Sequence, residues 1–344
     1  MPPELLSYVE NFVKENIARN NVAIIGRRNA GKTTTLTRLA LELVEKNFVV
    51  VVDSATQHVE KSLIKKLARA HEGSHLIELN APEKFSSNLE PKSKLLLCDV
   101  SHFLELSFEQ NLSREKNFYL NVYRRLLEKF FAALNELPPP FFLLLDEIDF
   151  DEKILQQVQR LNSRGNFFVS AVHDAASLHE MTGVKILNLD RARLDLNLNL
   201  PKESKILCGN CCVEVAASIF YNRHCRIPKP LVCCAELSGA LESVGISTKV
   251  FYHDNQSPSE LVAELAENFC GIYSVDSKIF NGAESLNDEH FVLAYIDKER
   301  KIILLNPQKN IVSVLRDYPT EKFWRACNSN FGGRVLLSKP AQSS

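Results

Sequence analysis

The strongest motif of the chain lies in the stretch NNVAIIGRRNAGKTTTLTRLALELVEKNFVVVVDSA, residues 20–55. Residues 22–25 form a short apolar run, residues 26–33 fit the pattern G-x-x-x-x-G-K-[ST], and residues 36–43 have apolar side chains at helical spacing. A strand, a tight turn and a helix in this order are typical of a phosphate-binding loop. The sequence therefore predicts a nucleotide site at the start of that helix.

Each residue type of this loop suits one part of a bound nucleotide. The glycines let the backbone turn its N–H groups toward phosphate, Lys32 adds a positive charge, and the Thr33 hydroxyl can ligate Mg²⁺. ATP is favoured over GTP, because the chain has neither an Asn-Lys-x-Asp pattern to read guanine nor an Asp-x-x-Gly switch. We expect ATP and Mg²⁺ as cofactors, with nucleotide contacts from Gly26, Asn29, Ala30, Gly31, Lys32, Thr33 and Thr34.

A second acidic site is predicted in the stretch FFLLLDEID, residues 141–149, where an apolar strand ends in two carboxylates. Asp146 suits an Mg²⁺ site through water, and Glu147 suits polarisation of the attacking water. Asp99, which closes the run KLLLCD, is the alternative for the metal. Asp146 is preferred because its neighbour adds a base to the metal partner. Apolar runs alternate with helical segments and predict an α/β fold with a parallel sheet, at 48–52, 95–100, 141–145, 167–172 and 185–189.

Residues 15–200 resemble the additional-strand P-loop ATPases, the group that contains the AAA+ and STAND proteins, on the motifs just quoted. The resemblance implies that the strand after the acidic one ends in a residue that senses the γ-phosphate. In FFVSAVHD this is Ser170, with His173 as the second choice. It also implies a possible nucleotide-dependent homo-oligomer, in which Arg191 or Arg193 reaches a phosphate of the neighbouring subunit; two solvated arginines are the alternative.

The length of 344 residues predicts two domains. The boundary is placed in LDLNLNLPKESK, residues 194–205, which gives an N-terminal P-loop NTPase domain at 1–200 and a second domain at 201–344. Lys and Arg total 41 against 42 Asp and Glu, so the charge predicts no nucleic-acid partner and no lipid surface. No apolar run approaches the roughly 20 residues of a membrane span, so we expect a cytoplasmic protein without a membrane partner.

Four of the nine cysteines lie in CGNCCVEVAASIFYNRHC, residues 208–225. In a reducing compartment they serve in metal binding, in catalysis or in a core. Structural zinc is one hypothesis, with His224, Cys225, Cys233 and Cys234 completing a set with the C-x-x-C pair, but the helical spacing after Cys212 speaks against it. The other hypothesis is a nucleophile, since a helix that starts at Cys208 lowers the pKa of its thiol. The remaining thiols are expected to be small core residues: Cys211, Cys212, Cys225, Cys233, Cys234 and Cys270.

A base for this thiol is predicted in DEHFVLAYIDKERKIILLNP, residues 288–307. His290 heads an alternating strand, a turn follows at 297–301, and a second strand at 302–305 is followed by Asn306-Pro307. A hairpin of this kind brings His290 and Asn306 close together. With Cys208 they form a Cys-His-Asn arrangement of thiolate, general base and orienting amide.

Residues 203–338 resemble the papain-like cysteine peptidases that process bacteriocin leaders after a double glycine, which implies an α+β fold. The matching pieces are Cys208-Gly209, AELSGALESVGI at 235–246, His290-Phe291 and Asn306-Pro307. The resemblance implies Cys208 as nucleophile, His290 as base and Asn306 as orienting residue. The family has Asp in place of Asn306, and Lys202 stands where the family has the Gln that donates to the oxyanion.

Two functions follow from these motifs. The first is an ATPase that regulates or feeds a cysteine peptidase, or a related acyl-transfer enzyme, acting on a peptide or protein substrate. The alternative is a nucleotide-driven switch whose papain-like domain is catalytically inactive and only binds peptide. Thiol reactivity separates the two, because only the enzyme needs a selectively reactive Cys208.

Overall fold

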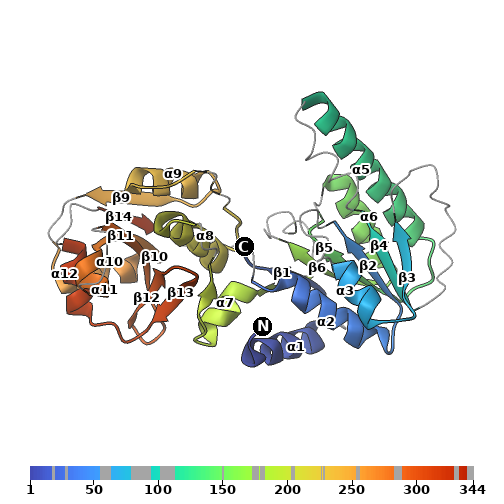
Figure 1. Ribbon diagram of the computed structural model, residues 1–344, viewed down its shortest axis with the longest axis horizontal. Coiled ribbons are helices and arrows are strands. Elements are labelled where there is room, and N and C mark those ends of the chain that lie inside the picture. The colour runs from blue at the N-terminus through green and yellow to red at the C-terminus, as the bar shows by residue number, and fades with distance from the viewer. Residues whose placement is uncertain are drawn as a thin grey trace. The chain divides into compact units, whose positions relative to one another are not determined.

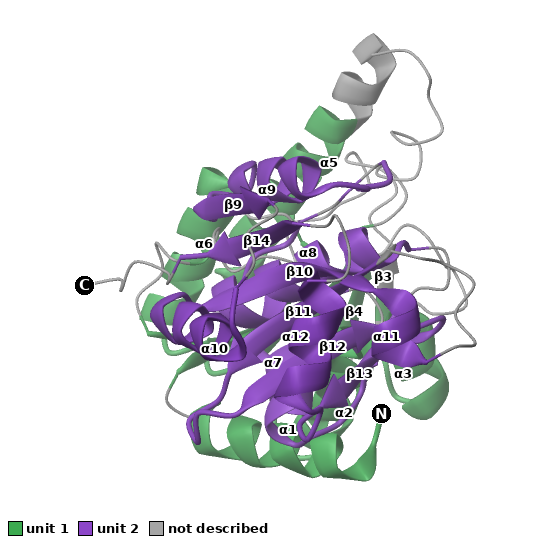
Figure 2. Ribbon diagram, turned by 90° about the vertical axis from the view of Figure 1, so that its left-hand side faces the viewer, with its two compact units in different colours: residues 1–25, 31–187 green, residues 26–30, 188–344 purple. Residues whose placement is uncertain are grey.

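The computed structural model describes residues 1–17, 20–27, 30–54, 63–78, 94–100, 113–148, 151–172, 178, 183–202, 206–225, 227, 229–252, 256–282, 289–328 and 333–338. The chain divides into two compact units (Figure 2). Residues 1–25 and 31–187 form unit 1, and residues 26–30 and 188–344 form unit 2. The boundary at residue 200 stays a prediction about domain organisation.

The sheet of unit 1 has seven strands in the order β3-β4-β2-β5-β6-β1-β7 (Figure 1). The six strands from β3 to β1 in that order pair in parallel. Strand β6 lies between β1, which leads into the predicted phosphate loop, and β5, which ends at Asp146. The strands are β1 (Asn21–Ile25), β2 (Val49–Asp53), β3 (His75–Glu78), β4 (Leu95–Asp99), β5 (Phe142–Asp146), β6 (Phe167–Val172) and β7 (Val184–Asn188).

Helices cover both faces of this sheet, which explains why the central strands β1, β2 and β5 are apolar except for Asn21, Asp53 and Asp146 at their ends. One set of alternate residues, among them Ala23 and Leu145, packs with α5 and α6 into a single core. The other set, among them Ile24 and Val51, is equally buried, and α2 and α3 contact the strands from this side. The helices are α1 (Pro3–Asn16), α2 (Lys32–Val44), α3 (Leu63–Ala70), α5 (Ser113–Leu134) and α6 (Glu152–Ser163). The predicted α/β class and parallel sheet are confirmed.

Unit 2 is built on a seven-stranded sheet in the order β8-β13-β12-β11-β10-β14-β9, in which neighbours are antiparallel. Its strands are β8 (Leu200–Pro201), β9 (Thr248–Tyr252), β10 (Cys270–Asp276), β11 (Glu289–Ile296), β12 (Ile302–Pro307), β13 (Ile311–Leu315) and β14 (Gly333–Leu337). Its helices are α7 (Leu189–Asp195), α8 (Cys208–Tyr221), α9 (Cys234–Glu242), α10 (Pro258–Glu267), α11 (Ser277–Asn281) and α12 (Thr320–Asn328).

Alternation along the strands of unit 2 creates two cores, one on each face of the sheet. Leu293 and Leu305 pack under α8 and α9 in the first core. Val292 and Leu304, one residue away along the same strands, belong to the second core with α10, α11 and α12. A parallel-sheet unit and an antiparallel-sheet unit with helices thus make up the chain. Among the described residues, no helix combines the length and the apolar character that a membrane crossing needs.

Candidate nucleotide and thiol sites

The part of the predicted phosphate loop that lies in unit 1 forms the start of α2. Gly31 is the N-cap of this helix with φ 108°, a left-handed conformation that favours glycine. Lys32 is buried, Thr33 is half-buried and Thr34 is exposed. The first N–H groups of a helix have no intrahelical partner and attract anions, so this terminus suits a phosphate.

The remaining loop residues, 26–30, belong by their contacts to unit 2. Asn29 lies outside the described residues. Gly26 opens this segment, and a Cβ added to it would lie 2.8 Å from the Cβ of Ala30, so the tight turn requires glycine. The N–H of Ala30 donates to the carbonyl of Arg27 at 3.1 Å.

Asp146 is a fully buried carboxylate at the end of β5. Neither of its oxygens has a hydrogen-bond partner among the described residues. Burial, Asp53 and Glu147 raise its pKa to about 7, and weaker opposing effects come from the Thr33 hydroxyl and the charge of Lys32. A buried carboxylate that lacks a partner beside a hydroxyl and an ammonium group fits a site for a hard cation and a phosphate. Thr33 and Asp146 therefore fit Mg²⁺.

Asp53 lies at the end of β2, beside Asp146, and was not among the site residues predicted from the sequence. It is paired in register with Asp146 on one side and with Asp99 on the other. Its carboxylate accepts a hydrogen bond from the N–H of Ile64 at 3.3 Å. Asp99, the alternative metal partner, is two strands from Asp146, or about 10 Å at the usual strand spacing. The signal for Asp53 was present in the sequence, because the apolar run 49–52 also ends in a carboxylate.

Glu147 follows the strand directly and has an exposed side chain. Its φ of 56° is uncommon for a residue other than glycine. Two hydrogen bonds hold this backbone: the N–H of Glu147 donates to the carbonyl of Ala171 at 3.0 Å, and the Ser54 hydroxyl donates to the carbonyl of Glu147 at 2.6 Å. Because of this turn the two neighbouring carboxylates point in different directions: Asp146 is buried and Glu147 is exposed to solvent.

Ser170 lies within β6 and is fully buried, with no partner for its hydroxyl among the described residues. Its alternate neighbours Phe168 and Val172 belong to the core under α5 and α6. Asp146 alternates with Leu145 of that same core, so the strands direct Ser170 and Asp146 to opposite faces of the sheet. The structure does not bring these two predicted residues together. His173 lies outside the described residues.

Cys208 is the first residue of α8, after the N-cap Leu207. Burial alone would raise the pKa of its thiol, but hydrogen bonding to His290, the charge of His290, and the N–H groups of Phe291 and Gly209 outweigh burial and lower it. A lowered pKa favours the thiolate, which is the nucleophilic form. Burial raises the pKa of the other cysteines for which a shift is found: Cys98, Cys211, Cys212, Cys225, Cys270 and Cys327.

His290 and Asn306 lie on the neighbouring strands β11 and β12. Nε2 of His290 is 2.7 Å from Oδ1 of Asn306. Nδ2 of Asn306 in turn donates to Oδ1 of Asn281 at 3.2 Å. The structure thus brings together the thiol, the imidazole and the amide that the sequence singled out.

Lys202 occupies the place of the expected oxyanion donor. Its ammonium group donates to the carbonyl of Gln308 at 2.6 Å. The thiols expected to be core residues are buried except Cys233, which is exposed. Among the described residues, no group of three or more His, Cys, Asp or Glu side chains is placed to hold a metal ion. The zinc hypothesis therefore gains no support from the described residues.

Comparison with known proteins gives only distant similarities. No protein-family model and no curated protein matches the chain. A Pif1 helicase from Candida albicans has a TM-score of 0.27 at 11% identity and covers 99% of this chain and 83% of its own. A second match is a structure described as the basis for DNA unwinding at forked dsDNA by two coordinating Pif1 helicases. Its TM-score is 0.24 at 13% identity, and the match covers 98% of this chain and 81% of the helicase chain. Scores this low do not establish a shared fold.

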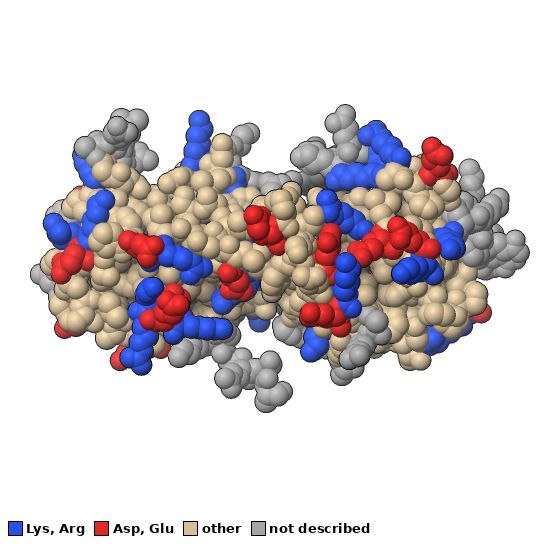
Figure 3. All heavy atoms as spheres, turned by 90° about the horizontal axis from the view of Figure 1, so that it is seen from below, with Lys and Arg blue, Asp and Glu red and all other residues tan. Residues whose placement is uncertain are grey.

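Matches this distant assign no nucleic-acid partner to this chain. One of them is nevertheless described by its unwinding of DNA, so the prediction that no nucleic acid is a partner is withdrawn as an exclusion. It rests on the overall charge of the chain, whereas single strands are bound by a local basic groove and stacking aromatic side chains. On the face drawn in Figure 3, basic and acidic side chains are interspersed.

Proposed function

We propose that the protein binds and hydrolyses ATP and carries a Cys208–His290–Asn306 site for thiol acyl transfer, with cleavage of a peptide or protein substrate as its reaction. The observation that carries the proposal is the arrangement in unit 2. A thiol with a lowered pKa stands at a helix N-terminus beside His290, and His290 lies 2.7 Å from the orienting amide of Asn306. Thiolate, base and orienting group are the parts that nucleophilic catalysis by cysteine requires.

In the proposed reaction the thiol proton passes from Cys208 to His290. The thiolate sulfur attacks the carbonyl carbon of the substrate, and the C–N bond breaks while His290 returns the proton to the leaving amine. Water, deprotonated by His290, then hydrolyses the thioester and releases the acid and the free thiol. The N–H of Cys208 itself, at the unpaired start of α8, is a donor available to the oxyanion.

The ATPase half of the proposal rests on unit 1. The start of α2 with Lys32 would hold the phosphates, Thr33 and Asp146 would hold Mg²⁺, and Glu147 would orient the attacking water. Bound Mg²⁺ supplies neutralisation of phosphate charge. The resemblance to additional-strand ATPases is supported by the strand order, in which β6 separates β1 from β5.

The alternative function, a peptide-binding switch without catalysis, is favoured by one observation. Lys202 stands at the position of the family's oxyanion donor, and its ammonium group is engaged by the carbonyl of Gln308. Loss of an oxyanion donor costs about 10²–10³ in rate, so a site without a substitute would be nearly silent.

The experiment is competitive labelling with a peptidyl vinyl sulfone, read by mass spectrometry at each cysteine. The proposal expects Cys208 to react first although Cys233 is exposed, and expects His290→Ala to remove that preference. Lys32→Ala should abolish ATP binding, measured by calorimetry, and leave labelling without nucleotide unchanged. Faster labelling of Cys233 than of Cys208 would reject the thiol enzyme in favour of the peptide-binding switch.

A further inference from the structure

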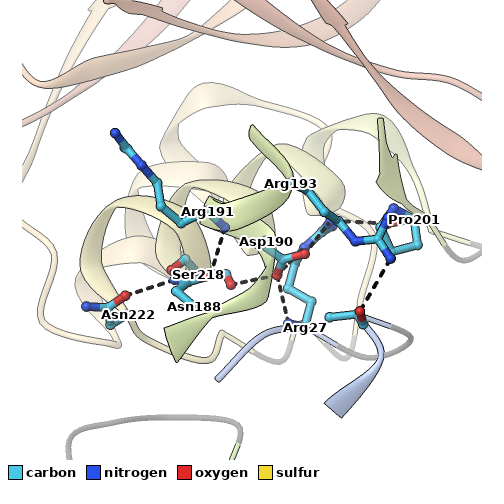
Figure 4. A network of polar contacts seen from close by, with 9 residues as sticks. Arg27, Asn188, Asp190, Arg191, Arg193, Pro201, Ser218 and Asn222 are labelled. Carbon is cyan, nitrogen blue, oxygen red and sulfur yellow. Dashed lines mark hydrogen bonds and ion pairs between the residues drawn. The ribbon is translucent and has the colours of Figure 1, made fainter. Parts of the chain in front are cut away.

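A buried ion pair in unit 2 holds the first part of the phosphate loop. The carboxylate of Asp190, on α7, accepts from the backbone N–H of Arg27 at 2.8 Å and from its Nε at 3.2 Å, both on Oδ2 (Figure 4). Nη2 of Arg27 is 3.5 Å from Oδ1. Asp190 is 0% exposed and Arg27 is 7% exposed. The Arg27 side chain is therefore committed to α7 and fixes the loop backbone at its own N–H.

Two further contacts tie the loop segment to its surroundings in unit 2. Nη2 of Arg27 also donates to the carbonyl of Pro201 at 3.1 Å. Arg193 of α7 is buried and donates to the carbonyl of Ala30 at 3.5 Å. Arg191, the other arginine considered for a neighbouring phosphate, is instead paired with Asp195 on the helix surface at 3.1 Å. Helix α7 is thus hydrogen-bonded to residues 26–30 at two places, Arg27 and Ala30.

The same carboxylate reaches helix α8. The Ser218 hydroxyl donates to Oδ2 of Asp190 at 2.8 Å. Asn188, the N-cap of α7, adds a second bond by donating to the carbonyl of Ser218 at 2.6 Å. Ser218 is ten residues after Cys208 on one continuous helix, a distance of about 15 Å along its axis. Asp190 is accordingly bonded both to the loop and to the helix that begins with the proposed nucleophile.

We propose that Asp190 is the positioning residue through which nucleotide occupancy of the phosphate loop changes the reactivity of Cys208. This inference rests on the proposed function and names its regulatory route. Separating a buried ion pair leaves an uncompensated charge, so Asp190 must follow Arg27 when the loop adjusts to a nucleotide. Ser218 moves with Asp190 because the two are hydrogen-bonded. Helix α8 then shifts as a rigid body, which changes the position of Cys208 relative to His290.

The test measures the coupling between two reversible ligands. A peptide aldehyde binds a reactive thiol by forming an S–C bond, with the thiol proton passing to the aldehyde oxygen. Its Kd is measured by calorimetry with and without a non-hydrolysable ATP analogue and Mg²⁺. Allosteric couplings usually change affinity by about 5–150-fold, and the nucleotide Kd must change by the same factor when the aldehyde is present.

Ser218→Ala is the variant that isolates the hydroxyl bond to Asp190, because it leaves in place both the Arg27–Asp190 pair and the bond from Asn188 to the backbone carbonyl of residue 218. We expect it to bind each ligand alone as the unchanged protein does and to lose most of the coupling. Ser238→Ala is the matched control: Ser238 is also a buried helical serine of unit 2, but its hydroxyl contacts Thr248 and Glu242. We expect the control to keep the coupling.

Two results would overturn the inference. One is an aldehyde Kd that is the same with and without nucleotide in the unchanged protein, a result that leaves the proposed function standing because both ligands bind. The other is full coupling in a folded Ser218→Ala variant. Failure of the unchanged protein to bind either ligand alone would instead remove the proposed function, and the inference with it.

Discussion

The Nδ2 atom of Asn306 donates to Asn281, and this bond turns Oδ1 of the same amide toward Nε2 of His290, 2.7 Å away. An acceptor oxygen facing Nε2 places the proton of a neutral imidazole on that nitrogen. Nδ1 is then left as the acceptor for the proton of Cys208. The amide of Asn281 therefore selects the tautomer that a general base needs at this place.

The reactivity of Cys208 should depend on pH in a way that His290 controls. Its lowered pKa means that the thiolate persists to a lower pH than it does for an ordinary thiol. We expect the rate of alkylation by iodoacetamide to have a midpoint at lower pH than the rate for a free cysteine, and His290→Ala to move the midpoint upward. Asn328→Ala, which removes an amide that contacts the carbonyl of Gln256, is the control and should leave the midpoint in place. Equal midpoints in the His290→Ala variant and the unchanged protein would contradict the assignment of the base.

Gly209, which follows Cys208 directly on α8, should not tolerate an added side chain. A Cβ at this position would lie 2.7 Å from the carbonyl oxygen of Leu231. The backbone of Leu231 is held in place, because its N–H donates to Oδ1 of Asn210. We expect Gly209→Ala to lower the stability of unit 2 by about 1–3 kcal/mol, the usual cost of overpacking, and to slow Cys208 labelling. Gly239→Ala is the contrast, because nothing lies within 4 Å of an added Cβ on α9. This variant should gain about 0.5–1 kcal/mol; equal thermal shifts for the two would contradict the packing argument.

Asp146 should destabilise the protein when it is ionised and no ligand is present. Burial, Asp53 and Glu147 raise its pKa from 3.8 to about 7 in the folded state. Because the folded pKa lies above the unfolded one, the carboxylate opposes folding increasingly as the pH rises from about 4 through 7, by on the order of 4 kcal/mol at the upper limit. Asp146→Asn should therefore raise Tm more at pH 8 than at pH 5.

The control for Asp146 is Glu152→Gln, an exposed carboxylate on α6 of the same unit. It should shift Tm by little at either pH. Addition of ATP and Mg²⁺ should stabilise the unchanged protein at pH 8 more than the Asp146→Asn variant, because the charge of the metal ion would offset the negative charge of the Asp146 carboxylate. A Tm difference independent of pH would show that the carboxylate is ionised in the unfolded and folded protein alike.

Breaking the Arg27–Asp190 pair should cost more than replacing it. Arg27→Met leaves a fully buried carboxylate without its counter-charge, and we expect a loss of about 3–5 kcal/mol. The double variant Arg27→Met and Asp190→Leu should recover most of that loss, because two apolar side chains have no charge to desolvate. Calorimetric unfolding of the single and double variants measures the difference. A double variant no more stable than Arg27→Met would indicate that the hydrogen bonds to the loop N–H and to Ser218 matter more than the charge pair.

Local sequence patterns were sufficient to predict the parallel sheet and to single out the candidate phosphate loop. The glycines, Lys32 and the apolar runs on each side constrain the backbone within a few residues of themselves, so no distant contact is needed to recognise them. The position of Asp146 at a strand end was legible for the same reason. Asp53 was missed, because strand neighbours are decided by the order β2-β5 in the sheet and not by their separation along the chain. The direction of Ser170 also depended on the register of β6 with β5.

The sequence by itself determined the local chemistry: a loop suited to phosphate, a strand ending in carboxylates, a thiol at the start of a helix, and a hairpin with His290 and Asn306. Only the tertiary structure decided which of these groups meet. Residues 26–30 pack with α7, encoded about 160 positions later, because a buried arginine requires a buried carboxylate and Asp190 supplies it. Such pairings are set by desolvation and by sheet order, which act between segments far apart in the chain and have no local signature.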